Sequence, residues 1–212
     1  MDERSVGLIL RVRPLTETSL IVHWLTPDLG RVATVAKGAR RPKSPFRGKL
    51  DLFYEADFSF QRSRRSDLHN LREVVLRETH ITLRRELGYV QQACYCAALI
   101  EQTTETDTPL PEVFPLFGGL LRHLPNIPPQ PLTGYAFEMK LLGNLGLKPD
   151  LSAAQLTTGA KLILQKLLEL NWAELSRLKL SKIQNAEISR FLHGFLMLHL
   201  GKIPKGRSPA SE

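Results

Sequence analysis

Cysteine is nearly absent from the 212 residues, and the two that occur, Cys94 and Cys96, stand two positions apart. Two cysteines exclude a disulfide framework and a four-cysteine zinc site, and they favour a reducing, cytoplasmic compartment. Side chains two positions apart on a helix point to nearly opposite sides, so this pair cannot chelate one ion together. We expect both cysteines to be buried as small apolar side chains, and we expect no metal.

Long apolar runs are also missing, and no stretch reaches the length of a membrane-spanning helix. The N-terminus, Met-Asp-Glu-Arg-Ser, is acidic and does not have the character of a secretory signal. Hydrophobic residues still make up 42% of the chain, which is enough to bury a core and excludes wholesale disorder. These features predict a globular cytoplasmic protein that makes no membrane contact.

Motifs of common catalytic sites are absent as well. The chain has no phosphate-binding Gly-x4-Gly-Lys-Ser/Thr loop and no Gly-x-Ser-x-Gly elbow for a serine nucleophile. One enzymatic alternative stays open, a metal-dependent nuclease that would use Asp51, Glu55 and Asp57. Glu55 and Asp57 share one face of a predicted strand, however, and that is also the pattern of a solvated strand face. We therefore predict no enzyme, no cofactor and no small-molecule substrate.

Acidic residues are missing from one segment, although the whole chain carries 29 Lys and Arg against 21 Asp and Glu, a net charge of +8. Residues 29–49 hold no acid and seven cations, namely Arg31, Lys37, Arg40, Arg41, Lys43, Arg47 and Lys49. Residues 86–160 carry a net charge of −4, and residues 161–207 one of +6. Seven like charges in one short stretch repel one another unless an anion lies nearby, so the segment favours a polyanionic partner.

The first eighty residues alternate apolar and polar side chains, which is typical of strands. We predict strands over 6–13, 52–60 and 68–76, and a hairpin over 18–37. The segment 37–49 contains Gly38, Pro42, Pro45 and Gly48, and therefore predicts a loop. Five short antiparallel strands suit a small closed barrel, because closure removes the exposed edges.

From Thr79 the apolar residues recur at helical spacing. The pattern predicts helices over 79–104, 111–124, 135–145, 157–170 and 181–200. We therefore divide the chain into a barrel domain, residues 1–79, a helical domain, residues 80–204, and a flexible polar tail, residues 205–212.

The segment Val35-Ala36-Lys37-Gly38-Ala39-Arg40-Arg41 resembles the RecO family of bacterial recombination mediators. The resemblance spans residues 4–146, because Arg13–Leu20, Leu71–Glu73 and the helical segment Phe137–Gly146 also look like that family. It implies a multi-domain α and β protein in which an N-terminal OB-fold antiparallel β-barrel is followed by an all-α helical domain.

The resemblance also implies a function. Proteins similar to RecO bind single- and double-stranded DNA, anneal complementary strands and join RecR. They act on DNA coated with single-strand-binding protein so that RecA can load. The expected role is therefore a DNA-binding, strand-annealing mediator of recombination in DNA repair, associated with the nucleoid. The alternative is a protein-interaction adaptor whose basic loop grips an acidic peptide.

Cations beside a barrel groove neutralise phosphates and release counterions, which gives affinity without sequence preference. The predicted phosphate contacts are Lys37, Arg40, Arg41, Lys43, Arg47 and Lys49, with support from Arg31, Arg64 and Arg65. Phe46 and Phe53 are candidates for stacking on bases, and the alternative for both is that they plug the barrel mouth.

The chain departs from the family pattern at two places. Several relatives carry a four-cysteine zinc cluster after the Phe-Glu helix, whereas residues 147–152 contain no cysteine, so we expect no zinc. Relatives can also place two arginines directly before Phe-Glu, where this chain has Tyr135-Ala136. Docking of the acidic tail of single-strand-binding protein is then expected to use Lys140, with Lys179, Lys182 and Arg190 as substitutes.

Overall fold

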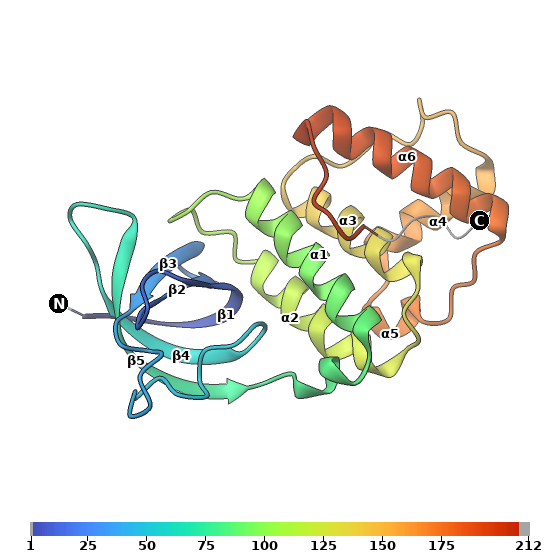
Figure 1. Cartoon of the computed structure of the whole chain (residues 1–212). Helices are drawn as coiled ribbons and strands as arrows, with labels where there is room; N and C mark the ends of the chain where they lie inside the picture. Colours follow the sequence, from blue (N-terminus) through green and yellow to red (C-terminus); the bar gives the residue numbers. More distant parts are fainter. Residues whose placement is uncertain (1, 208–212) are drawn as a thin grey trace. The chain divides into compact units, whose positions relative to one another are not determined.

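The structure is a computed structural model that describes residues 2–207, and it divides into two compact units (Figure 1). The first unit contains the chain up to Ile81 together with Thr104–Pro115. The second contains Thr82–Thr103 and the chain from Leu116 onward. The helical domain predicted for residues 80–204 therefore has an interruption, because one of its interhelical segments groups with the barrel.

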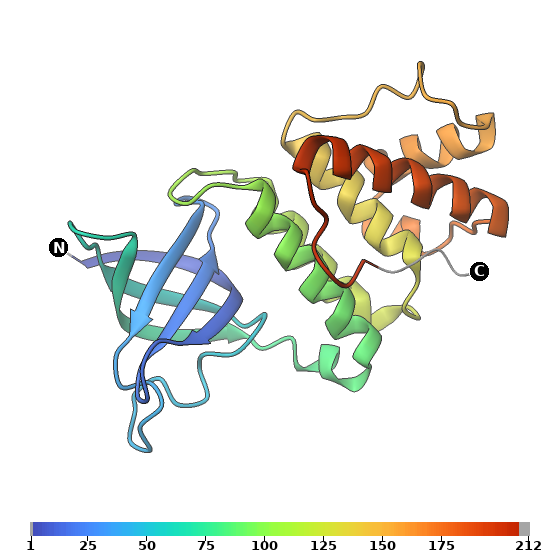
Figure 2. The same ribbon diagram turned by 45° about the horizontal axis from the view of Figure 1, so that its top comes forward.

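Five strands form the first unit, as the alternation predicts. They are β1 (Asp2–Pro14), β2 (Leu20–Leu25), β3 (Arg31–Ala36), β4 (Glu55–Gln61) and β5 (Leu68–Glu78). They pair in the order β1-β2-β3-β5-β4, and β4 pairs back onto β1, so the sheet closes into a barrel (Figure 2). The pairs are antiparallel except that β3 and β5 run parallel. This is the arrangement of an OB fold, and the predicted fold class is confirmed.

Aromatic rings fill the barrel. Trp24 on β2 stacks on Phe58 of β4 with ring centroids 4.2 Å apart, and Phe60 stacks behind Phe58 at 5.6 Å. The indole Nε1 of Trp24 donates to the hydroxyl of Thr34 at 2.8 Å, so the polar atom of this buried ring is satisfied. Gly7 leaves the space that this stack needs, because a Cβ there would lie 2.8 Å from the Phe58 ring. On β2, β3 and β4 the inward positions are those that the period of two predicts, whereas on β1 Ile9 packs in the barrel core in place of Leu8 and Leu10, and the register shifts between Ile9 and Arg11.

The segment Thr104–Pro115 returns to the barrel after the first long helix. The amide of Asp107 donates to the Arg31 carbonyl at 3.0 Å, and Arg31 forms an isolated parallel bridge with Thr106. Gly30 permits this approach, since a Cβ on it would lie 2.2 Å from the Thr108 carbonyl oxygen and its φ of +70° is unfavourable for other residues. Local sequence patterns gave no sign of this contact, because it joins residues more than seventy positions apart.

The second unit is helical. Its elements are a 3₁₀ helix over Ile81–Arg85, α1 (Leu87–Thr103), α2 (Val113–His123), a 3₁₀ turn over Leu124–Asn126, α3 (Pro131–Asn144), α4 (Thr158–Glu169), α5 (Trp172–Leu175) and α6 (Lys182–Leu200). The start of α2 at Val113 is grouped with the first unit. None of the helices within residues 2–207 combines the length and the apolar character needed to cross a membrane.

The observed helices differ from the predicted ones most clearly at three places. The helix predicted over 79–104 is divided, because His80 takes a left-handed conformation (φ 47°) and a 3₁₀ helix precedes α1. The helix predicted from Tyr135 begins at Pro131, whose fixed φ suits the first helical position. The short helix α5 was not predicted, and it follows a capping box between Asn171 and Glu174. On α1, Cys96 is buried as predicted but Cys94 is exposed.

Apolar faces of α3, α4 and α6 form the core of the helical unit, which includes Tyr135, Met139, Leu164, Leu167, Ile188 and Leu192. The side chains of Thr157 and Ser181 cap the N-termini of α4 and α6. Of the tail predicted over 205–212, residues 205–207 belong to the described part of the chain, and Arg207 pairs there with Glu138. Residues 208–212 lie outside the described part of the chain.

Candidate nucleic-acid interface

The basic loop, which we define as residues 37–54 between β3 and β4, is built from consecutive turns. The amide of Arg41 donates to the Gly38 carbonyl, that of Ser44 to the Arg41 carbonyl and that of Arg47 to the Ser44 carbonyl, at 3.0–3.2 Å. Gly38 and Gly48 take positive φ angles that these turns require. The loop is therefore a folded element that presents its side chains in fixed directions.

Several contacts hold the basic loop to the barrel, and two of them lie near its cations. The ring of Phe46 enters the barrel core and is only 7% exposed. The amide of Arg40 donates to the Thr18 carbonyl at 3.0 Å, which places the loop beside the turn between β1 and β2. Because of these anchors, the cations of the loop stay close to one end of the barrel.

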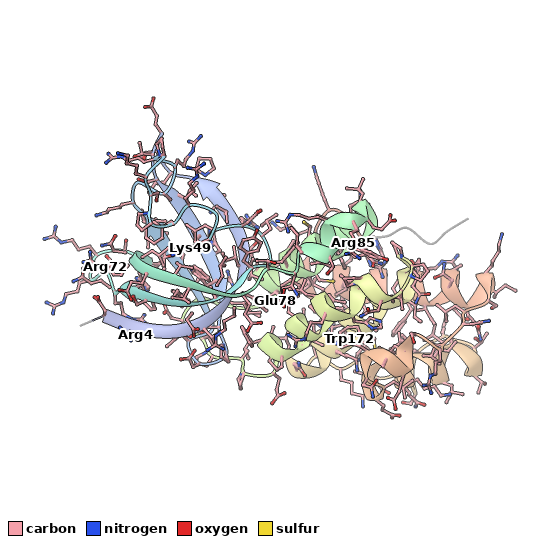
Figure 3. The ribbon with its side chains drawn as sticks, turned by 90° about the horizontal axis from the view of Figure 1, so that it is seen from below. Arg4, Lys49, Arg72, Glu78, Arg85 and Trp172 are labelled. Atoms are coloured by element: carbon pink, nitrogen blue, oxygen red, sulfur yellow. The ribbon has the colours of Figure 1, made fainter. Side chains whose placement is uncertain are left out.

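The cationic side chains of the basic loop have no acidic partners. Lys37, Arg40, Arg41, Lys43 and Arg47 are exposed, and Lys49, labelled in Figure 3, is partly exposed. Arg40 and Arg47 reach only backbone carbonyls, those of Thr16 and Pro42, at 3.4 and 3.3 Å. Within residues 2–207, none of these six cations forms an ion pair with a carboxylate. The structure thus gathers six of the predicted phosphate contacts on one element.

Arg31 is placed differently from the basic loop. Its Nε donates to the hydroxyl of Thr104 at 2.8 Å, and its Nη2 donates to the Thr104 carbonyl. Arg31 lies at the beginning of β3, whereas the loop follows the end of that strand. Its guanidinium group fixes the returning segment, so the structure does not support Arg31 as a phosphate contact.

Arg64 and Arg65 lie in the turn between β4 and β5, at the opposite end of β3 from the basic loop. Because β5 runs parallel to β3 and Leu68 pairs with Ala33, this turn lies beyond the Arg31 end of β3. The length of β3 then separates the two sites by about 17 Å. Both arginines are exposed, so they form a second cationic patch rather than an extension of the loop.

The neighbouring Arg62 holds this turn in place. It forms ion pairs with Glu3 at 2.8 Å and with Asp107 at 2.7 Å. The hydrogen bond from Arg62 lowers the pKa of Glu3, although partial burial opposes this change. Arg62 is therefore engaged with the protein's own carboxylates, unlike the cations of the basic loop.

The two phenylalanines proposed for base stacking are both buried. Phe46 is packed in the barrel core, and Phe53 is 2% exposed. The strand predicted over 52–60 would place Phe53 on the same polar face as Glu55, but the φ of 68° at Phe53 turns the chain before β4 begins at Glu55. Neither ring presents a face to a base, so the structure favours the alternative that they plug the barrel.

Two arginines on β1 that were not among the predicted phosphate contacts lie at the same end of the barrel as the basic loop. Arg13 is exposed, and its Nη2 lies 3.1 Å from Nε2 of His23 on β2. Burial, together with the Arg13 and Arg11 guanidinium groups, lowers the pKa of His23 to about 4. The period of two puts Arg11 and Arg13 on one face, and this was the signal that could have identified them.

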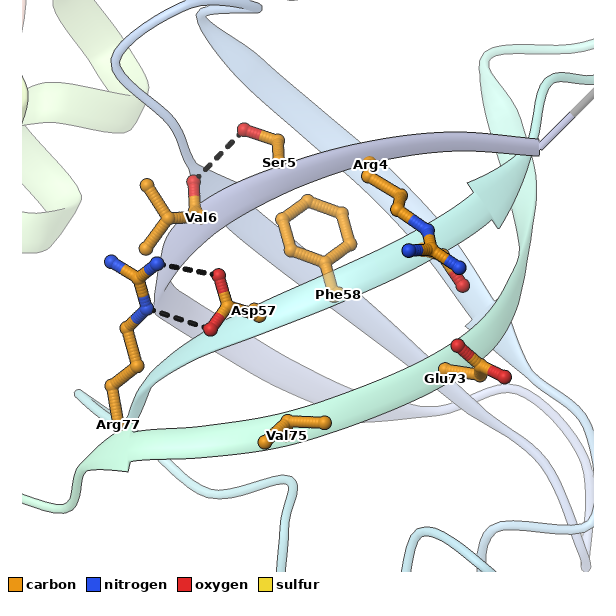
Figure 4. A pocket seen from close by; sticks show the side chains of 9 residues that line it. Arg4, Ser5, Val6, Asp57, Phe58, Glu73, Val75 and Arg77 are labelled. Carbon is orange, nitrogen blue, oxygen red and sulfur yellow. Dashed lines mark hydrogen bonds and ion pairs between the residues drawn. The ribbon is translucent and has the colours of Figure 1, made fainter.

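The outer wall of the barrel has a hollow of about 390 Å³ over β1, β4 and β5 (Figure 4). Its charges are balanced, with Arg4 and Arg77 against Asp57 and Glu73. Arg77 pairs with Asp57 at 2.7 Å, which engages one carboxylate of the nuclease alternative. Over the described residues, no group of three His, Cys, Asp or Glu side chains is arranged to hold a metal ion. This wall therefore offers no argument for phosphate binding or for hydrolysis.

In the helical unit the predicted docking lysines separate into two groups. The Nζ of Lys140 donates to the Leu168 and Leu170 carbonyls at 2.9 and 2.7 Å, and burial lowers its pKa. It closes the C-terminal end of α4 and is not available to a partner. Lys179 and Lys182 are exposed and line a hollow of about 400 Å³ whose apolar wall includes Leu132, Leu178 and Leu180. Arg190 is exposed on α6 but does not line this hollow.

Comparison with known proteins gives two family matches. Residues 1–80 match the model "Recombination protein O N terminal", and residues 86–157 match "Recombination protein O C terminal". The first range contains the barrel and its basic loop, and the second contains α1 to α3. Residues 158–207, which hold α4 to α6, lie beyond both matches.

Curated relatives carry the printed name "DNA repair protein RecO". The chain is 35% identical to the protein of Idiomarina loihiensis over 144 residues, which cover 68% of this chain and 61% of that protein. It is 30% identical to the protein of Bacillus pumilus over 148 residues, or 70% and 57% of the two chains. For the protein of Anaeromyxobacter dehalogenans (strain 2CP-C) the identity is 33% over 150 residues, or 71% and 59%. The chain thus spans about three fifths of the length of these relatives.

Proposed function

Because the chain belongs to the RecO family of DNA repair proteins, we propose that its barrel binds DNA through the basic loop and promotes the annealing of complementary strands. One observation supports the assignment to the loop above others. Six cations lie on a folded element, and no carboxylate of the described chain neutralises them. Binding of a polyanion to such a surface is favourable, because its negative groups neutralise the unpaired cations and counterions are released.

Strand annealing requires only that phosphate repulsion be screened while the base edges stay accessible. The two candidate phenylalanines are buried and Tyr54 packs against the barrel core, so contact with phosphates would be the loop's main mode of binding. Phosphate contacts carry no sequence information, which suits a protein that acts on any pair of complementary strands. No covalent chemistry is needed, and we propose no catalytic residue.

The partners are part of the same proposal. We propose that the protein acts with RecR on DNA coated with single-strand-binding protein, so that RecA can load. For the acidic tail of single-strand-binding protein, the hollow beside Lys179 and Lys182 is the best-supported site, since it combines an apolar wall with two exposed cations. Lys140 is left out of this proposal because it is engaged by two backbone carbonyls.

Salt dependence tests the phosphate contacts of the basic loop. If six phosphates are neutralised on a single strand, a plot of log affinity against log salt concentration has a slope of about −4. Fluorescence anisotropy on single-stranded, duplex and tailed DNA over a range of salt concentrations measures this slope. A slope near zero would contradict the proposal, because binding would then not depend on counterion release.

Charge reversal tests the acidic-tail site separately. The probe is a fluorescent aspartate-rich peptide that carries an apolar residue. We expect Lys179→Glu/Lys182→Glu to weaken its binding at least about tenfold, because two attractions become repulsions. The matched control is Lys166→Glu/Lys202→Glu, which changes the net charge equally at two exposed positions away from the hollow. Equal losses in both variants would contradict this location and indicate an effect of net charge alone.

A further inference from the structure

The helical unit contains a fully buried carboxylate that the proposed DNA and peptide sites do not use. Glu138 on α3 is 0% exposed. Its two oxygens accept from Nε and Nη2 of Arg207 at 2.8 and 2.9 Å, and Oε1 also accepts from the hydroxyl of Tyr95 at 2.7 Å. Burying an unpaired carboxylate is costly, so this position requires a cation with donors in a fork.

Other groups of the pocket also fit a guanidinium ion. Nη1 of Arg207 donates to the Ser189 carbonyl of α6 at 3.3 Å, and the guanidinium carbon lies 5.5 Å from the centre of the Tyr135 ring. A carboxylate fork, a carbonyl and an aromatic face together match the planar shape and the donor pattern of arginine, and they do not match a lysine ammonium. Burial acts to lower the pKa of Arg207, but the interactions with Glu138 outweigh it and the pKa is raised.

The guanidinium group that fills this pocket belongs to a short segment that follows α6 and is neither helix nor strand. Helix α6 ends at Gly201, which takes a left-handed conformation, and only six residues lead from there to Arg207. Before Arg207, this segment is held by a hydrogen bond from Gln102 to the Lys202 carbonyl at 2.6 Å. The ion pair to Glu138 is therefore its main attachment, and Ser189 and Arg207 both lie beyond the residues that the family models match.

A hollow of about 660 Å³ adjoins the pocket, and residues 205–207 form one of its walls. Its lining includes Gln92, which is 6% exposed and whose Oε1 has no hydrogen-bond partner in the described structure. The Nε2 of the same side chain donates to the Gln130 carbonyl at 2.7 Å, so the oxygen is the atom of this amide that is buried without a partner. A departure of the segment would join this hollow to the Glu138 pocket and add an unused acceptor beside it.

We propose that the pocket around Glu138 is a guanidinium-binding site, that the segment 202–207 fills it as an intramolecular latch, and that on release of the latch it accepts an arginine side chain from another polypeptide. Charge complementarity argues for an arginine as the occupant. The buried carboxylate of Glu138 lines the pocket, and Oε1 of Gln92, the unpartnered group nearby, is a hydrogen-bond acceptor. The inference does not depend on the proposed DNA binding, because the pocket and the basic loop belong to different units.

Chemical rescue tests the site. In the full chain, Arg207→Ala leaves Glu138 buried without a cation, and the melting temperature of the helical unit is expected to fall by about 10 °C. Methylguanidinium at millimolar concentration, far below the molar range that denatures proteins, should recover most of this loss by occupying the vacated pocket. Sodium chloride and methylammonium at equal concentration should not, and Glu138→Gln/Arg207→Ala should show no rescue.

A peptide with the sequence of residues 201–207 tests access by a second chain. It should bind Arg207→Ala at least roughly tenfold more tightly than it binds the unaltered protein, whose own latch competes, and the same peptide with alanine at the last position should not bind. If Arg207→Ala does not fold, Arg207→Lys is used for both titrations. Absence of rescue by methylguanidinium, or equal rescue by methylammonium, overturns the site. Rescue without peptide binding overturns the exchange with a second chain.

Discussion

Arg40→Glu/Arg41→Glu is expected to lower the affinity for single-stranded DNA by roughly 100-fold. The variant removes two attractions to phosphate and adds two repulsions, and four such changes at about 0.7 kcal/mol each amount to about 3 kcal/mol. The slope of log affinity against log salt concentration should also become shallower, from about −4 to about −3, because two fewer phosphates are neutralised. Fluorescence anisotropy at several salt concentrations measures both quantities.

The fold should survive this change. Both side chains are exposed and form no ion pair with a carboxylate of the described chain, so the melting temperature should be nearly unchanged. Lys166→Glu/Lys202→Glu again serves as the matched control, because it alters the net charge equally in the other unit. Binding that persists in Arg40→Glu/Arg41→Glu with its salt slope intact would exclude the basic loop as the DNA site. A comparison with Arg64→Glu/Arg65→Glu measures what the second cationic patch contributes.

Phe46→Ala is expected to destabilise the barrel by about 3–5 kcal/mol, because it empties a ring position in the core. The ring packs in the cluster that contains Trp24 and Phe58, and it also anchors the basic loop. Urea unfolding followed by tryptophan fluorescence measures the loss, since Trp24 reports on this core. DNA affinity should fall as well, because a released loop has to be ordered again at a cost in conformational entropy.

The conservative variant Phe46→Leu distinguishes a ring that fills the barrel core from a ring that stacks on DNA bases. Phe46→Leu retains most of the apolar volume and should cost about 1 kcal/mol, with DNA affinity almost unchanged. A stacking ring would give the opposite result, because leucine has no aromatic face and the affinity would fall in both variants while stability stayed high. That outcome would show that Phe46 leaves the core when DNA binds.

Much of the fold could be predicted because its signals are local. Alternation identified the strands, the helical period identified the helices beyond Thr79, and prolines and glycines identified the loop between β3 and β4. The predicted boundaries of strands and helices were wrong where the φ angle of one residue interrupts the periodic pattern. Phe53 continues the alternation of β4 in sequence, yet its positive φ turns its ring into the core.

The candidate site was predicted in part for the same reason. The six cations from Lys37 to Lys49 are neighbours along the chain, so their common location followed from the loop alone. Arg31 and Lys140 have no such local signal. Each is engaged by backbone or hydroxyl groups of a distant segment, Thr104 in one case and Leu168 and Leu170 in the other.

The amino-acid sequence by itself determined the order of strands and helices, the place of the basic loop and the family, because periodicity and short motifs act over a few neighbouring residues. Only the tertiary structure decided which charged side chains remain available to a partner. Arg207 and Glu138 are 69 positions apart, and nothing near either one indicates that they meet in a buried pair. Ion pairs between residues that are distant in sequence are set by the packing of their segments, so they can be identified only from the folded structure.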